Sequence, residues 1–228
     1  MLEVIRFPSI LVVATATFLS SPSAGLAQAP GSAVVPLKHT SIVTMDKRIE
    51  AVHGDHTKPG EPFVIRIHAE AGYIIMPHTH PVDENIVVIQ GSWALGMGDR
   101  FKRQSLEPLE VGDYAFAGKG MAHFALAKSD TIVQVHGIGP FSVHWVVPVY
   151  ELTEHGVLYK TLAEDPGRVA AKVPQDCFAL KLGVHVHGSY GDGVVVGAQC
   201  TPGELTQYRI QRPDGARFWA LSDELKTL

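Results

Sequence analysis

Residues 72–91 read GYIIMPHTHPVDENIVVIQG, and this stretch decides the fold: two histidines and a glutamate follow a short apolar run. In an extended strand, residues i and i+2 point to the same side, so His78 and His80 direct two imidazoles toward one point. Pro81 then interrupts the strand hydrogen bonding, which lets the chain bend and bring Glu84 toward the same point. The stretch therefore predicts a site built from two imidazoles and a carboxylate.

A fourth candidate ligand comes from a second glycine-rich stretch. Residues 112–127 read GDYAFAGKGMAHFALA, and His123 opens a strand directly after a tight glycine turn. Two histidines with one carboxylate form the ligand set of non-haem iron oxygenases, and the same donors also suit other transition metals. With His123 added to His78, His80 and Glu84, the sequence predicts a centre for one divalent metal: Fe, Mn, Ni, Cu or Zn.

These two stretches resemble the paired signature motifs of the cupin superfamily. The first stretch matches at every signature position, which are Gly72, His78, His80, Glu84 and Gly91, and the second keeps Gly112, Gly120 and His123. Gly118 and Ala127 stand where the family usually has Pro and Asn, and neither position is a ligand. The resemblance covers about residues 60–150. It implies a double-sheet jelly-roll barrel that holds the metal on His78, His80, Glu84 and His123.

Short strand-like runs around the motifs favour the same fold class. Glycine-bearing breaks separate most of these runs, which are Phe63–His68, Tyr73–Met76, Asn85–Ile89, Tyr114–Ala117, His123–Ala127, Thr131–His136 and Ser142–Val149. We therefore predict a mainly β chain with a cupin-type barrel over residues 61–150. An N-terminal strand or arm over residues 28–60, with a strand near Thr40–Met45, precedes the barrel.

Residues 151–228 have no counterpart in the resemblance and are predicted to form a small β-rich extension of unknown role. Phe178–His187 and Gly193–Gln199 predict a hairpin, and Leu205–Ile210 predicts a further strand. The polar stretch Leu152–Lys172 predicts a helical turn or a linker.

The extension also carries both cysteines of the chain, Cys177 and Cys200. In an exported protein such a pair predicts a disulfide. The alternative is a metal site that these cysteines form with His185 and His187, which lie between them.

The N-terminal residues 1–27 predict a secretory signal peptide. Ile10–Leu19 is an apolar run of ten residues, too short to span a bilayer, and small residues lead to a cleavage site after Ala27. We expect a mature protein in the periplasm or secreted, not bound to membrane after cleavage. The net charge of −4, with no cluster of basic residues among 228, excludes a typical nucleic-acid-binding protein.

The resemblance implies a metal-dependent enzyme, dioxygenase-like, acting on a small organic molecule, with Glu84 as catalytic base when it leaves the metal. A non-catalytic module that binds or senses a metal or small molecule, and a cupin isomerase or lyase, are the alternatives. Gln134 and His136 share one strand face and are candidates for orienting a ligand, or else are satisfied polar residues. Trp93 is predicted to belong either to the core or to the wall of a cavity. The resemblance further implies a homodimer.

Overall fold

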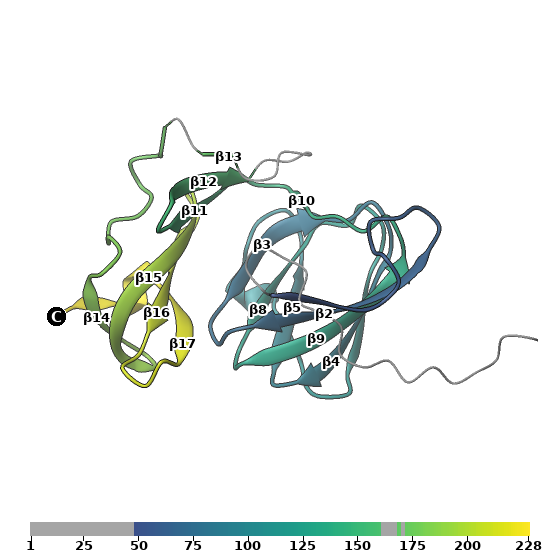
Figure 1. Cartoon of the computed structure of the whole chain (residues 1–228), viewed down its shortest axis with the longest axis horizontal. Coiled ribbons are helices and arrows are strands. Elements are labelled where there is room, and N and C mark those ends of the chain that lie inside the picture. Colours follow the sequence, from purple (N-terminus) through teal and green to yellow (C-terminus); the bar gives the residue numbers. More distant parts are fainter. Residues whose placement is uncertain (1–47, 161–167, 170–171) are drawn as a thin grey trace, which may run out of the picture. The chain divides into compact units, whose positions relative to one another are not determined.

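The computed structural model describes residues 48–160, 168–169 and 172–228 of the chain. The predicted signal peptide and the predicted strand near Thr40–Met45 lie outside these residues. Within the described ranges the secondary structure consists of β-strands and two short 3₁₀ turns, Arg103–Ser105 and Ser222–Glu224. No helix in this part of the chain has the length and hydropathy needed to cross a bilayer. The prediction of a mainly β fold is confirmed (Figure 1).

Two five-stranded antiparallel sheets form the barrel. The first sheet has the strand order β1 (Ile49–His53), β2 (Pro62–Ala69), β9 (Thr131–Ile138), β4 (Glu84–Gln90) and β7 (Tyr114–Ala117). The second has the order β10 (His144–Trp145), β3 (Ile74–Thr79), β8 (His123–Ala127), β5 (Trp93–Met97) and β6 (Glu107–Leu109). Consecutive strands therefore often lie in different sheets, as jelly-roll connections require.

Alternation along the strands decides which side chains face the interior of the barrel. In β9, Val133 and Val135 are buried, whereas Ile132 and Gln134, which alternate with them, are half-buried on the other face. The buried valines join one apolar core with inward residues of neighbouring strands, among them Phe63, Ile65, Ile86 and Val88. Each such side chain contributes about 1.5–3 kcal/mol when fully buried.

Six predicted runs correspond to barrel strands, whereas β5 and β6 are not among the predicted runs and both ends of the barrel differ. β1 pairs with β2, so the first sheet includes residues 49–53, which the sequence analysis placed in an N-terminal arm. The run Ser142–Val149 is not one strand. It is divided between β10, of two residues, and β11 (Val149–Thr153), which pairs with strands of the extension.

The extension forms a third, antiparallel sheet. Its strands are β11, β12 (Gly156–Lys160), β13 (Arg168–Val169), β14 (His185–Gly188), β15 (Gly191–Thr201), β16 (Leu205–Gln211), β17 (Arg217–Leu221) and β18 (Lys226–Thr227). The predicted hairpin is present as β14–β15, although β14 begins only at His185, and the predicted strand at Leu205 is β16.

The predicted helical turn or linker after Leu152 is wrong for residues 152–160. These residues belong to a β11–β12 hairpin, in which Tyr150 and Tyr159 face each other with ring centroids 4.8 Å apart. Aromatic and β-branched residues on both strands pack well across a hairpin, and this preference outweighs the polar residues at its turn.

The disulfide prediction is confirmed: Cys177 and Cys200 are bonded to each other. His185 and His187 are exposed on β14, while Val186 between them is fully buried. Because the disulfide occupies both sulfur atoms, the alternative cysteine–histidine metal site is excluded.

The extension contacts the barrel at the start of the first motif. Trp219 N–H donates to the carbonyl oxygen of Ala71 at 2.7 Å, and its indole N–H donates to Glu70 at 3.1 Å. Gly72 has a φ of +82°, and a Cβ there would lie 1.9 Å from the Trp219 carbonyl oxygen. Only glycine therefore fits at position 72, where the turn lies against β17. This position is also the first residue of the first sequence motif.

Candidate metal centre

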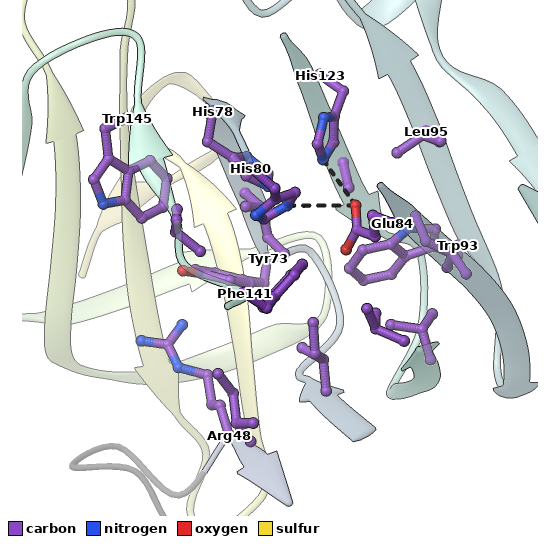
Figure 2. A pocket seen from close by; sticks show the side chains of 18 residues that line it. Arg48, Tyr73, His78, His80, Glu84, Trp93, Leu95, His123, Phe141 and Trp145 are labelled. Atoms are coloured by element: carbon purple, nitrogen blue, oxygen red, sulfur yellow. Dashed lines mark ion pairs between the residues drawn. The ribbon is translucent and has the colours of Figure 1, made fainter. Parts of the chain in front are cut away.

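Three imidazoles converge inside the barrel, as Figure 2 shows. His78 lies near the end of β3, His80 follows that strand, and His123 begins β8, where it pairs directly with His78. One ring nitrogen from each of the three histidines lies within 4.8 Å of the other two. All three are buried, at 5%, 4% and 2% exposure, so the cluster is not a chance gathering of surface histidines.

A β-bulge in β3 turns His78 toward the interior. Ile75 lines the same cavity as His78, yet residues three apart in a regular strand face opposite sides. The β3–β8 register shifts between Ile75 and His78, and this irregularity places both side chains on the inner face. His80, two residues further, also lies on that face, as the sequence pattern predicted.

Backbone carbonyls hold the second nitrogen of each imidazole. The Nδ1 atoms of His78, His80 and His123 lie 2.8, 2.8 and 3.0 Å from the carbonyl oxygens of Met76, Ser142 and Met121. A carbonyl only accepts, so each Nδ1 carries the proton and donates. The three Nε2 atoms are then left as lone-pair donors, which is the tautomer that a metal ligand needs.

Glu84 reaches the same point from the first sheet, as the first residue of β4. Its Oε2 lies 3.4 Å from His80 Nε2 and 3.1 Å from His123 Nε2 (Figure 2). Burial favours the neutral carboxyl, but the two neighbouring imidazoles outweigh it and hold the pKa of Glu84 well below its usual range. Burial likewise opposes the charge of His123, yet Glu84 raises the pKa of this imidazole above its ordinary value.

Residues of both sequence motifs thus meet between two five-stranded antiparallel sheets. The chain contains a double-sheet jelly-roll barrel, the fold that the cupin resemblance implies. All four predicted ligand residues are brought together, three as a histidine cluster and the fourth, Glu84, in contact with two members of that cluster.

Solved structures similar to this chain include several cupins. The KdgF protein from Halomonas sp. is 20% identical over 41% of this chain and 80% of its own, with a TM-score of 0.33. An RmlC-like cupin from Desulfovibrio desulfuricans is 23% identical over 45% and 95% of the two chains, with a TM-score of 0.34. A double-stranded β-helix protein from Klebsiella pneumoniae is 26% identical over 41% and 78%, with a TM-score of 0.33. No protein-family model and no curated protein matches the chain.

A cavity of about 150 Å³ lies next to the histidine cluster, and most of its walls are apolar. Phe141 stacks on the ring of His80, with centroids 4.2 Å apart, and Trp145 lies 5.6 Å from His78. Arg48 lies 4.5 Å above the ring of Tyr73 and forms an ion pair with Glu151 at 3.4 Å. Sequence reasoning did not single out Phe141, Trp145 or Arg48, since none of them belongs to either motif.

The expectation that Gln134 and His136 orient a ligand is not met. Val133 and Val135 of the same strand line the cavity, so the two polar side chains, which alternate with them, lie on the outer face of β9. The groups that orient the imidazoles are main-chain carbonyls instead. The alternation of valine with polar residues in Thr131–His136 was the sequence signal for this arrangement.

The titration of His78 gives a testable pH dependence. Burial disfavours the charged imidazole, and with the nearby charges of His123 and His80 it lowers the pKa of His78 from 6.5 to about 3. Between these values the unfolded chain binds a proton that the folded chain does not, so stability falls as the pH is lowered. The slope for this one group approaches about 1.4 kcal/mol per pH unit.

We therefore expect the metal-free protein to lose about 2–3 kcal/mol between pH 6.5 and pH 4.5 through His78. His123 acts in the opposite direction, because its raised pKa stabilises the fold below the unfolded value of 6.5. Urea unfolding of wild type and His78→Gln across this range isolates the contribution of His78. Equal pH slopes for the two proteins would contradict the assignment.

Proposed function

We propose that the chain is an exported, metal-dependent cupin enzyme of the dioxygenase class that acts on a small organic molecule. The observation that carries this proposal is the arrangement of three buried imidazoles. Each has its Nδ1 bound to a main-chain carbonyl, which leaves three Nε2 lone pairs for one ion.

The residues around the cluster fit a divalent metal. His78, His80 and His123 would hold it, with Glu84 as the fourth ligand, and these nitrogen and carboxylate donors suit Fe, Mn, Ni, Cu or Zn. His80 Nε2 and Glu84 Oε2 are buried without a hydrogen-bond partner, and a cation between them would satisfy both atoms. Such a metal, when bound, supplies a Lewis acid and, if redox-active, electrons for reaction with dioxygen.

The other residues of the cavity position a substrate and keep water away from it. Phe141 and Trp145 offer flat apolar faces beside His80 and His78, and a planar substrate packs well against such faces. Glu84 is held ionised by its lowered pKa, which suits a ligand better than a proton acceptor. The role of Glu84 Oε2 as a base is therefore a secondary part of the proposal and requires the carboxylate to leave the metal.

Export is supported by the disulfide between Cys177 and Cys200, because such bonds persist mainly in oxidising compartments. The predicted signal peptide over residues 1–27 points to the same compartment, the periplasm or the medium.

One observation favours a second candidate function, a cupin module that binds or senses a metal or small molecule without turnover. Among the described residues that line the cavity, only Arg48 and Tyr73 are ionisable apart from the four ligand residues. An enzyme that needs a separate acid or base would have to use one of these two, or Glu84.

The two functions are separated by loading the full chain with Fe, Mn, Ni or Cu and measuring oxygen consumption with a panel of phenols and diketones. The enzyme predicts uptake with at least one compound and a loss of more than about a hundredfold in the His80→Ala variant. Stoichiometric metal without uptake or product would contradict the enzyme and support the binding module. Failure to bind any metal would contradict both.

A further inference from the structure

One residue that lines the cavity carries a buried polar atom that a metal ion would not satisfy. Six side-chain nitrogen or oxygen atoms of the described residues are buried without a hydrogen-bond partner, and three of them belong to residues that line the cavity: His80, Glu84 and Trp93. The first two atoms belong to proposed metal ligands and lie 3.4 Å apart. The third, the indole N–H of Trp93, is a donor and cannot ligate a cation.

Trp93 is held rigidly at this place. Its side chain is only 3% exposed, and the residue begins β5, where it pairs with Ala127 of β8 on one side and Leu109 of β6 on the other. Figure 2 shows its indole beside Glu84, with Trp145 on the other side of the imidazoles. A buried N–H without a partner costs about 1–3 kcal/mol, so its presence beside the ligand cluster calls for an acceptor supplied from outside the chain.

We propose that Trp93 Nε1–H donates a hydrogen bond to an oxygen of the ligand, while a second oxygen of the same ligand binds the metal. This inference rests on the proposed metal site, and it names the substrate class. The ligand is a compact, largely apolar molecule that carries two oxygens close together, such as an aromatic carboxylate.

The size and walls of the cavity select against more polar ligands. Its volume of about 150 Å³ is similar to that of an engineered apolar cavity that holds benzene. Each additional hydroxyl of a sugar-like ligand would be buried against residues such as Ile67, Ile86 and Val135 without a partner. One donor at Trp93 and the metal together satisfy two ligand oxygens.

Two probes that differ in their second oxygen test this role of Trp93. Benzoate offers one oxygen to the metal and one to the indole, whereas phenol offers only one. Binding is measured from the visible spectrum of the full chain loaded with Co²⁺, for wild type and for Trp93→Phe, which keeps an aromatic ring but removes the donor. We expect Trp93→Phe to weaken benzoate binding about tenfold and to leave phenol binding within about twofold.

The variant Trp145→Phe is the matched control, since it removes an indole from the same cavity and should affect both probes equally. A second readout uses the unmutated protein: in the ¹⁵N-labelled, Zn²⁺-loaded chain, benzoate but not phenol should shift the Trp93 indole proton downfield. Equal weakening of both probes by Trp93→Phe, or no binding of benzoate to the Co²⁺-loaded wild type, would overturn the role of Trp93 alone. Loss of Co²⁺ in Trp93→Phe would reassign Trp93 to support of the metal, and a wild type that binds no Co²⁺ would overturn the proposed function as well.

Discussion

Replacing His80 by alanine is expected to lower the affinity for a divalent metal by more than about a hundredfold. Loss of a mere hydrogen-bond partner of a metal ligand typically costs 10- to 100-fold in affinity, and removing a ligand itself should cost more. His80 Nε2 is also buried without a hydrogen-bond partner, so its lone pair is available to a metal. Metal content after dialysis against a competing chelator gives the measurement, on protein purified without a metal-affinity tag.

His136→Ala is the matched control for this experiment. His136 lies in the barrel, half-buried on β9, but on the face that points away from the cavity. We expect the His136→Ala variant to retain about as much metal as the wild type. A metal affinity that falls equally in both variants would show that the loss reflects damage to the barrel, and a His80→Ala variant that keeps its metal would contradict the assigned ligand set.

The ligands could be predicted from the sequence because their placement depends on local geometry. Two histidines two residues apart share a strand face in any register, and glycine turns fix the start of each motif. The outer position of His136 followed from an equally local signal, the alternation with Val133 and Val135, which outweighs the polarity of the intervening residues.

Other features of the site depend on contacts between distant parts of the chain. Phe141 contacts His80 because the segment after β9 passes over the cluster. Arg48 lines the cavity from the position just before β1, which pairs with β2. Neither residue lies in a periodic pattern that points to the cavity. The attachment of the extension likewise depends on a long-range contact, because the Gln207 side chain binds the backbone of Ile74, more than a hundred residues earlier in the chain.

Gln207→Leu is expected to destabilise the fold by about 3–6 kcal/mol, because three buried hydrogen bonds would each lose a partner. Gln207 is fully buried. Its Oε1 accepts from the Ile74 N–H at 2.9 Å, while its Nε2 donates to the Ile74 carbonyl at 2.7 Å and to Gln199 Oε1 at 2.7 Å. Leucine has a similar volume, so the loss measures the polar contacts and not a cavity.

The contacts of Gln207 explain why this one residue should matter for the barrel. Ile74 pairs with Leu126 of β8 on one side of β3, whereas β10 covers the other side only at His78 and Thr79. The amide of Gln207 thus takes the place of a neighbouring strand at the open edge of β3, and burial without it would leave the Ile74 backbone unpaired. Through this contact the extension completes the strand that carries His78.

Urea unfolding of Gln207→Leu beside Gln211→Leu separates this role from a general effect of leucine on β16. Gln211 lies at the end of the same strand, where its Oε1 accepts an exposed hydrogen bond from Arg217, and its replacement should change stability by no more than about 0.5 kcal/mol. Faster hydrogen exchange at the Ile74 amide in Gln207→Leu alone would locate the loss at β3. If both variants unfold at the same urea concentration, the extension is not coupled to the barrel through Gln207.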